Sequence, residues 1–531
     1  MRIPKLVIGA VATALLAAGC GQAAPGGRPA QAGGAGAASG SFTYAIGDEP
    51  ETLNPVLQDE HTDPVTELVF RGLTRHDADN KVVPGLAESW RVSEDGKSYT
   101  FTLRKGLTWH DGKPLTSADA KFTIETVRDA GTDAPLSRNF RTVTGVETPD
   151  ETTVKLTLDR PFAPMLHSLS VGLLPRHLLE GKKVTDPAYG RAPVGAGPFK
   201  LVTWKHGQYA ELAAFDGYYE GRPGLGKIVI KYVPDDTARL VQLTGGEVDG
   251  ANIAPQQAAK VKGLANLRTE VYPTADYRAL MLNFKFPVFG DKKLRQALNH
   301  AVDRDAIVKS VVLGYGKPAS GPLDESPYAA ATPYTFDPAK VTSLMTEAGY
   351  AKDANGIWAK DGKPVRFELS TFAEESLRVA ILNVAATQLK AQGFDVVPMP
   401  RPRDQVRKNW AGQQSFVVGW GTPYDPDSSV YGPFHSSEAL SKGGSNFGEY
   451  ANPEVDKALE EARSTMDEGK RRAAYERFQK ALADDPPFVW IAYLQTLNVV
   501  PADMTGPQRR TLGHHGYGFF WNAEKWRRNA S

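Results

Sequence analysis

The pattern of apolar and polar positions predicts strands in both halves of the chain. Tyr99, Phe101 and Leu103 alternate with polar residues between two Asp-Gly turn dipeptides. Such alternation between turns is typical of half-buried strands in a hairpin. The same kind of pattern indicates strands in the segments TTVKLTL, KIVIKYV, VRFELSTF, QSFVVGW and FVWIAYLQTLNVV.

Helical patterns are interspersed with these strands. Thr116 and Asp119 fit a capping box, the residue pair that often begins a helix. Phe122, Ile124 and Val127 follow at mostly helical spacing. Amphipathic helices are also predicted in LRQALNHAVDRDAIVKSVV and VDKALEEARSTMDEGKRRAAYERFQKAL. The chain is therefore predicted to be a mixed α/β protein, and no solenoid-type repeat is visible in it.

The length of the chain adds a prediction of more than one lobe. With 531 residues it exceeds the roughly 250–300 at which a single core stops growing. The middle of the chain has no linker rich in proline, glycine and serine. We therefore expect two lobes joined by strands, and YRALMLNFK and FVWIAYLQTLNVV are the candidates for these connections. A net charge of +1 gives no general attraction to nucleic acid.

The N-terminus has the layout of an export signal. Arg2 and Lys5 precede an apolar run at residues 6–18, which is too short for a permanent membrane span. The run ends in LAAGC, and Cys20 is the only cysteine of the chain. This end resembles the lipobox of bacterial lipoproteins, which implies a signal peptide at residues 1–20 and a lipid on Cys20. The alternative is a plain cleavage site with a chance cysteine.

Between the signal and the folded body lies a segment of low complexity. Residues 21–41 consist almost only of glycine, alanine, proline, glutamine and serine. Such a composition buries too little apolar surface to order itself, so we predict a flexible tether.

The common catalytic templates are missing from the sequence. We find no G-x-S-x-G elbow and no H-E-x-x-H zinc helix, and the one cysteine is assigned to the lipid. We therefore predict no enzyme activity and no cofactor. A hydrolytic pair among the many carboxylates stays possible in principle, because sequence alone does not place two of them together.

Aromatic residues gather in a segment that follows a predicted strand. Trp420, Tyr424, Tyr431 and Phe434 lie in VVGWGTPYDPDSSVYGPFHSSE, which is also rich in glycine, proline and aspartate. Aromatic side chains on loops fixed to rigid elements are a common lining of ligand clefts. The alternative is that these aromatic rings pack the loop onto the core.

From residue 42 onward the sequence contains a series of distinctive segments. The first is GLAESWRVSEDGKSYTFTLRKGLTWHDGKPLTSADAKFTIE, and it is followed by APVGAGPFKL, VPDDTARLVQLTGGEVD, LRQALNHAVDRDAIV and GWGTPYDPDS. The first segment is similar to the signature region of family 5 of the extracellular solute-binding proteins of ABC importers, and the others follow in the order of that family, which includes dipeptide-, oligopeptide- and nickel-binding members. The resemblance implies a two-lobed α/β periplasmic-binding-protein fold of class II, cluster C type, with an extra subdomain in lobe I.

The resemblance also implies where the lobes lie and what the protein does. Lobe I is expected at residues 42–280 and 495–531, and lobe II at 281–494. The implied function is an extracytoplasmic, monomeric lipoprotein that encloses a peptide between its lobes and delivers it to an ABC permease. Two alternatives stay open: binding of nickel or a nickel chelate, and a surface enzyme or peptide-signal receptor on the same scaffold.

The choice between peptide and nickel rests on few residues. In peptide binders of the family an aspartate three residues after the loop tryptophan pairs with the ligand amine, but here that position is Pro423. The nearest acid is Asp425, in a string similar to the WGxPYDP of nickel-binding members. Asp425 is expected either to take an amine or to cap its own turn before Pro426.

The resemblance implies further ligand contacts. His435 lies where nickel-binding members place a metal-binding histidine, and the alternative is a surface histidine. Arg378 is the candidate for a ligand carboxylate, because guanidinium offers a bidentate fork, and the alternative is a helix-surface arginine. His61 and Thr62, in a loop after the first strand, are weaker candidates to face the cleft.

Overall fold

The computed structural model describes residues 40–58, 63–330 and 334–528, which all belong to one compact unit, Ala38–Ser531. The predicted signal peptide, Cys20 and nearly all of the tether lie outside the described residues, as do His61 and Thr62. None of the described helices combines the length and the apolar character needed to cross a bilayer.

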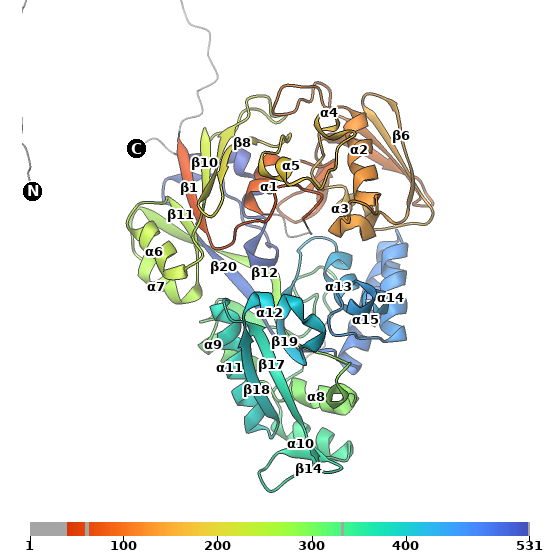
Figure 1. The fold of residues 1–531 in the computed structure, drawn as a ribbon, viewed down its shortest axis with the longest axis vertical. Helices are drawn as coiled ribbons and strands as arrows, with labels where there is room; N and C mark the ends of the chain where they lie inside the picture. The colour runs from red at the N-terminus through yellow and green to blue at the C-terminus, as the bar shows by residue number, and fades with distance from the viewer. Residues whose placement is uncertain (1–39, 59–62, 331–333, 529–531) are drawn as a thin grey trace, which may run out of the picture. The chain divides into compact units, whose positions relative to one another are not determined.

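An 11-stranded sheet organises the described residues (Figure 1). Its central pair, β12 and β20, runs antiparallel and carries strands from the C-terminal half on one side and from the N-terminal half on the other. A short strand, β13, pairs with β20 off the main path. The order along the sheet is β18 (Asp395–Arg401), β17 (Arg366–Phe372), β19 (Ser415–Trp420), β12 (Leu267–Leu282), β20 (Phe488–Pro501), β11 (Gly250–Ile253), β1 (Ser41–Ile46), β10 (Lys227–Tyr232), β9 (Tyr209–Ala214) and β8 (Phe199–Lys205), with β13 at Gly316–Pro318.

The two segments expected to connect the lobes are therefore the two central strands. Pairing between β12 and β20 is interrupted between Pro273 and Tyr277. In this gap Thr274 forms a parallel bridge with Leu512, and the backbone N–H of Ala275 donates to the Leu512 carbonyl at 2.8 Å. The middle of β12 thus turns from its neighbouring strand to the C-terminal segment around residue 512.

The hairpin predicted around Tyr99 is confirmed. It belongs to a four-stranded antiparallel sheet in which Tyr99, Phe101 and Leu103 are buried. The adjoining helix α2 (Ser117–Arg128) begins at a capping box between Thr116 and Asp119, as the sequence predicts. The sheet consists of β4 (Ala87–Val92), β5 (Ser98–Leu103), β7 (Thr153–Leu158) and β6 (Val143–Asp150).

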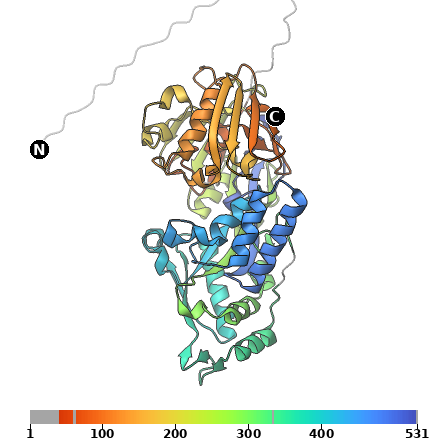
Figure 2. The ribbon, with the colours of Figure 1, turned by 90° about the vertical axis from the view of Figure 1, so that its right-hand side faces the viewer.

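The two long amphipathic segments each form two helices instead of one. Asp303 accepts a hydrogen bond from the Ala306 N–H and begins α9 (Arg304–Ser310) after α8 (Lys292–His300). Asp467 does the same for α15 (Glu468–Asp484) after α14 (Pro453–Ser464). An N-cap aspartate inside an amphipathic run thus starts a new helix. Figure 2 shows α14 and α15 in blue, side by side.

Most of the remaining elements are short, whereas α11 (Ser376–Ala391) has 16 residues and contributes to the core. The helices are α1 (Pro64–Val69), α3 (Met165–Ser168), α4 (Arg176–Leu179), α5 (Pro187–Arg191), α6 (Asp236–Thr244), α7 (Ala258–Val261), α10 (Pro338–Glu347), α11 (Ser376–Ala391), α12 (Arg403–Lys408) and α13 (Pro426–Phe434). The small sheets are formed by β2 (Thr74–His76) with β3 (Val82–Pro84), β14 (Ala351–Lys352) with β15 (Trp358–Lys360) and β16 (Lys363–Pro364), and β21 (Met504–Thr505) with β22 (Arg527–Arg528).

The buried side chains fall into two sets. One set of clusters draws its buried members from residues 277–494. The other set draws them from residues 42–272 and 497–526. The interruption in β12 lies at the border between these sets, which makes it the natural place for a site between two packed bodies.

Candidate functional site

A cavity of about 720 Å³ lies where these two sets of residues meet. Its lining comes from segments far apart in the chain: the loop after β1, the start of α6, the end of β11, the starts of α11 and α12, the middle of β20, and residues 515–520. Volumes of about 300–1,000 Å³ are usual for pockets that bind small molecules.

Both acidic and basic side chains line this large cavity. Asp48, Glu49 and Glu51 follow β1, whereas Arg403 and Arg407 lie on α12. Arg407 and Glu51 approach to 3.2 Å and so connect the two segments. Although the Asp48 side chain is 69% exposed, desolvation raises its pKa, and Glu375 adds to the rise while nearby arginines oppose it. The cavity therefore offers both acidic and basic groups to a ligand.

The floor of the large cavity contains a buried carboxylate, Asp276. His514 donates from Nδ1 to Oδ1 of Asp276 at 2.6 Å, and the backbone N–H of His515 donates to Oδ2 at 3.2 Å. Arg278 forms an ion pair with the same carboxylate. Burial acts to raise the pKa of Asp276, but Arg278 and His514 outweigh it and hold the pKa well below its usual range. Asp276 is therefore a charged hydrogen-bond acceptor inside the protein.

His515 follows directly and lines the cavity. Its backbone has φ 55° and ψ 16°, the left-handed region that residues with a Cβ seldom adopt. Burial lowers the pKa of His515 well below its usual value, and His514 and two arginines add to this effect. The imidazole is thus neutral at pH 7, and one of its nitrogens is available as an acceptor or metal ligand.

The two glycines that flank Trp420 make room for this network. A Cβ on Gly419 would lie 2.2 Å from Nη1 of Arg278 and 2.9 Å from a ring carbon of His514. A Cβ on Gly421, where φ is +136°, would lie 1.8 Å from the Ala275 carbonyl oxygen. The GWG string is therefore required for the close approach of β19 to β12 and the C-terminal segment.

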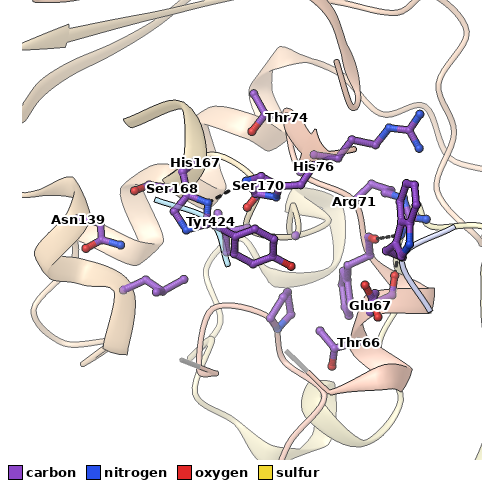
Figure 3. A pocket seen from close by; sticks show the side chains of 18 of the residues that line it. Thr66, Glu67, Arg71, Thr74, His76, Asn139, His167, Ser168, Ser170 and Tyr424 are labelled. Carbon is purple, nitrogen blue, oxygen red and sulfur yellow. Dashed lines mark hydrogen bonds between the residues drawn. The ribbon is translucent and has the colours of Figure 1, made fainter. Parts of the chain in front are cut away.

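A second, smaller cavity of about 150 Å³ lies beside α1, β2 and α3 (Figure 3). His167 and His76 share a hydrogen bond of 2.9 Å between Nδ1 and Nε2, and Tyr424 stacks on His76 with ring centres 4.1 Å apart. Burial lowers the pKa of His76 well below its usual value. Burial also raises the pKa of Glu67 to about 6, against the opposing charges of Arg510 and Arg71.

Two of the sequence candidates line a cavity. Tyr424 lines the small cavity, and Arg510 donates to its hydroxyl at 3.3 Å. Arg378 lines the large cavity, but it is buried, donates to the Val417 carbonyl at 3.0 Å and pairs with Glu375. Its guanidinium therefore already has partners within the protein.

Four other candidates lie outside the lining of these two cavities. Trp420 stacks near Phe447 and Phe488, with ring centres 6.0 Å apart in each case. Asp425 caps α13 and pairs with Arg471 at 2.6 Å.

Tyr431 and His435 are also used inside the protein. Tyr431 donates to Glu460 at 2.6 Å, and the Arg463 guanidinium lies over its ring. The His435 ring stacks on Tyr431 and accepts from the Ser437 N–H at 3.0 Å. Both side chains therefore contribute to the packing around α13 and α14.

Several cavity residues were not among the sequence candidates. Asp48, Arg403 and Asp276 stand in no motif that would distinguish them from other charged residues. The doublet His514-His515 was the one visible signal, because adjacent histidines are uncommon in a chain with 10 histidines. Within the described residues no group of three or more His, Cys, Asp or Glu side chains is arranged to hold a metal ion.

A cavity between two packed bodies that share two central strands defines a solute-binding protein of the two-lobed type. The chain belongs to the bacterial extracellular solute-binding proteins, family 5, whose model for the middle region matches residues 81–441. The two-lobed α/β fold expected from the sequence is thereby confirmed.

Similar proteins are found among curated sequences and solved structures. Protein XP55 of Streptomyces lividans is 31% identical over 466 residues, which are 87% of this chain and 85% of that protein. The oligopeptide-binding protein AppA of Bacillus subtilis is 31% identical over 507 residues, 90% of each chain. The structure of NikZ from Campylobacter jejuni in complex with Ni(L-His) has a TM-score of 0.87 and 35% identity, covering 92% of this chain and 99% of that one.

Proposed function

We propose that this protein captures peptides outside the cytoplasm and delivers them to the permease of an ABC importer. The observation that carries the proposal is the large cavity, with acids on the segment after β1 and arginines on α12. A short peptide is a zwitterion, so a cavity lined by both acidic and basic side chains suits it. The similarity to an oligopeptide-binding protein over 90% of both chains supports the same assignment.

The residues proposed to recognise the peptide ends are Asp48 and Arg403. Asp48 offers a carboxylate to the amine. Arg403 is 38% exposed and keeps donors for the carboxylate beyond its ion pair with Glu375. Arg378 is proposed to support this part of the cavity wall and not to bind the peptide itself, because its own contacts are with Val417 and Glu375.

Native mass spectrometry and a thermal-shift panel of di- to hexapeptides test the proposal. At least one peptide is expected to add its mass and raise the melting temperature, because a ligand that binds only the folded state stabilises it. Asp48→Asn is expected to weaken that peptide's binding. A panel without added mass or stabilisation would contradict peptide binding.

A second candidate is a chelate of nickel with an amino acid. The observation that favours it is His515, a neutral imidazole on the lining of the large cavity. Imidazole is a ligand that suits nickel. The described residues hold no group of three metal-ligating side chains, so the chelator would have to supply most ligands. The Campylobacter jejuni neighbour was solved with Ni(L-His), at 35% identity.

Calorimetric titrations distinguish the peptide from the nickel chelate as the ligand. Nickel(II) with L-histidine and a tetra-alanine peptide are titrated separately into the purified protein, and nickel(II) alone serves as the control. Heat released by the nickel–histidine mixture, but not by nickel alone or the peptide, would select the chelate. Heat from the peptide only would select the first candidate.

We also propose that Cys20 carries a lipid that anchors the protein to the membrane, that the protein acts as a monomer, and that it catalyses no reaction. Cys20→Ala is expected to move the protein from the membrane fraction to the soluble fraction. Cleavage of any bound peptide during prolonged incubation would contradict the absence of catalysis and favour an enzyme on the same scaffold.

A further inference from the structure

Asp276 lies where three segments of the chain meet. It belongs to β12, at the point where that strand leaves β20 and pairs with Leu512. The partner histidines belong to the C-terminal segment, 238 residues further along the chain. The third segment is the end of β19, because the His514 N–H donates to the Gly421 carbonyl at 2.9 Å. A change in the bonds of Asp276 would therefore affect all three segments.

The carboxylate uses each of its oxygens for a different purpose. Oδ1 accepts from His514 Nδ1, which keeps a proton on that nitrogen and fixes the orientation of the ring. Arg378 Nη2 lies 3.5 Å from Nε2 of the same ring. Oδ2 accepts from the backbone N–H of His515. The same side chain thus orients one histidine ring and holds the backbone of the next residue.

The backbone of His515 needs such support. At φ 55° it is in the left-handed region, where the Cβ of a residue other than glycine is crowded by the backbone. Unfavourable backbone conformations persist when the surroundings over-determine them, and they gather at functional sites. The hydrogen bond to Asp276 is one of the contacts that hold this conformation, and the conformation places His515 on the cavity lining.

The space around the network is restricted by the backbone as well. Gly419 leaves no room for a Cβ beside Arg278 and His514. Both Asp276 and His515 line the large cavity, but the Asp276 side chain is only 3% exposed whereas that of His515 is 31% exposed. A ligand in the cavity therefore meets more of His515 than of this carboxylate, and Asp276 is placed to act on the ligand mainly through His515.

We infer that Asp276 is a positioning residue of the binding site, which holds the His514–His515 segment so that His515 faces the ligand in the large cavity. This inference rests on the proposed function, because it requires that the large cavity is where the solute binds. It assigns to β12, one of the two central strands, a part in solute recognition that is exerted through His515.

The experiment compares Asp276→Asn with the full-length protein, using nickel(II) with L-histidine and tetra-alanine as probes. Asparagine keeps the shape and one acceptor oxygen but loses the charge that attracts His514 Nδ1–H. The dissociation constant of the probe that binds the unchanged protein is expected to rise at least tenfold. Binding is measured by calorimetry well below the melting temperature of each variant.

Asp249→Asn is the matched control for the loss of a carboxylate. Asp249 also pairs with an arginine, Arg528 at 2.9 Å, and accepts a backbone N–H, that of Thr43 at 2.8 Å. It lies outside the lining of both cavities. Its replacement is expected to lower the melting temperature while the dissociation constant changes less than twofold. A fall in affinity for this variant as well would assign the effect to stability and overturn the inference.

A spectroscopic measurement follows the bond itself. In protein labelled with ¹⁵N-histidine, His514 is expected to show a protonated Nδ1, and Asp276→Asn is expected to change the signal of that nitrogen. If Asp276→Asn does not fold, His514→Leu removes the donor and keeps the Asp276–Arg278 pair, and the same tenfold loss is expected.

The outcomes distinguish the inference from the proposed function. If the unchanged protein binds neither probe nor any peptide of the panel, the proposed function fails and the inference fails with it. If it binds a probe and Asp276→Asn or His514→Leu binds it equally well, the inference alone is wrong.

Discussion

The segments at residues 420–435 and 512–517 both approach the interruption of β12, yet the protein uses them differently. In the first segment, several aromatic and charged side chains contact other residues of the protein, such as Phe488, Arg471 and Glu460. In the second, the side chain of His515 is left on the lining of the large cavity. The difference shows that a cluster of aromatic and charged residues in a sequence is as consistent with a loop anchored by internal contacts as with a binding surface.

The anchoring of the first segment has a physical purpose. Gly419 and Gly421 let β19 lie close to β12 and to the C-terminal segment. Asp425 then caps α13 and pairs with Arg471 of α15. The first segment thus forms the rigid wall against which the second segment is held, and substitutions in the two are expected to have opposite consequences for stability and binding.

The largest expected effect is on stability, in Asp425→Ala. The Asp425 and Arg471 side chains are 10% and 9% exposed, and loss of one partner from such a buried pair costs about 3–5 kcal/mol. The free energy of unfolding, measured in urea, is expected to fall by that amount, while the affinity for ligand changes less than about twofold.

Asp467→Ala is the control for the capping role alone. Asp467 caps α15 through the Lys470 N–H at 2.8 Å and lies at an exposed position. Loss of a cap costs about 1 kcal/mol, so the two variants should differ by several kcal/mol. Equal losses would show that the Asp425–Arg471 pair adds little, and a loss of ligand affinity in Asp425→Ala would return Asp425 to the binding site.

His515→Gly is expected to act in the opposite way. Glycine adopts the left-handed conformation at residue 515 without crowding, so the free energy of unfolding should rise by about 1 kcal/mol. The loss of the imidazole is expected to weaken binding of nickel(II) with L-histidine about 100-fold, or about 2.8 kcal/mol. Urea unfolding and calorimetry measure the two changes.

His515→Ala separates the two causes, because alanine removes the imidazole and keeps the Cβ. It should lose the same affinity without the gain in stability. If His515→Gly bound the chelate as well as the unchanged protein, the second segment would not contact that ligand, and the contrast between the two segments would disappear.

Much of the fold follows from local patterns, and the site does not. The alternation around Tyr99 predicts a strand, and the capping box at Thr116 predicts the start of a helix, in both cases from neighbouring residues alone. The family assignment extends this to the two-lobed architecture. The contact between Asp276 and His514 joins residues 238 positions apart. No local pattern encodes such a contact, because it depends on where β12 leaves its neighbouring strand.

The same reasoning explains the candidates on either side of Trp420. The sequence shows that aromatic rings are concentrated there, but whether a ring faces a cavity or a neighbouring helix is decided by packing. Tyr424 lies on a cavity and Tyr431, seven residues later, lies under Arg463. For the histidine doublet at 514–515 the structure supplies what the sequence lacks: His514 bonds to Asp276, and His515 lines the large cavity.

A smaller effect is expected for Arg403→Ala. Arg403 lines the large cavity and is 38% exposed, so its charge is partly screened by water. Loss of one charge-assisted hydrogen bond to the peptide carboxylate is expected to weaken binding about tenfold, or about 1.4 kcal/mol. Calorimetry with the best peptide of the panel measures this change.

Arg366→Ala is the matched control for Arg403→Ala. Arg366 also pairs with an acid, Asp395 at 3.5 Å, but it lies outside the lining of both cavities. Its loss should leave peptide affinity unchanged. If Arg366→Ala weakened peptide binding as much as Arg403→Ala, the effect would come from the overall charge of the protein and not from a contact.

The smallest effect is expected for His435→Ala, which tests the first segment at the residue that the family resemblance favours as a metal ligand. His435 is 10% exposed, its Nδ1 accepts from the Ser437 N–H, and its Nε2 lies 3.5 Å from Glu460. These contacts lie outside the lining of both cavities, so the affinity for nickel(II) with L-histidine should change less than about twofold. The free energy of unfolding should fall by about 1 kcal/mol because one hydrogen bond is lost. A tenfold loss of chelate affinity here, with His515→Ala unaffected, would move the metal-binding role back to residues 420–435 and reverse the contrast between the two segments.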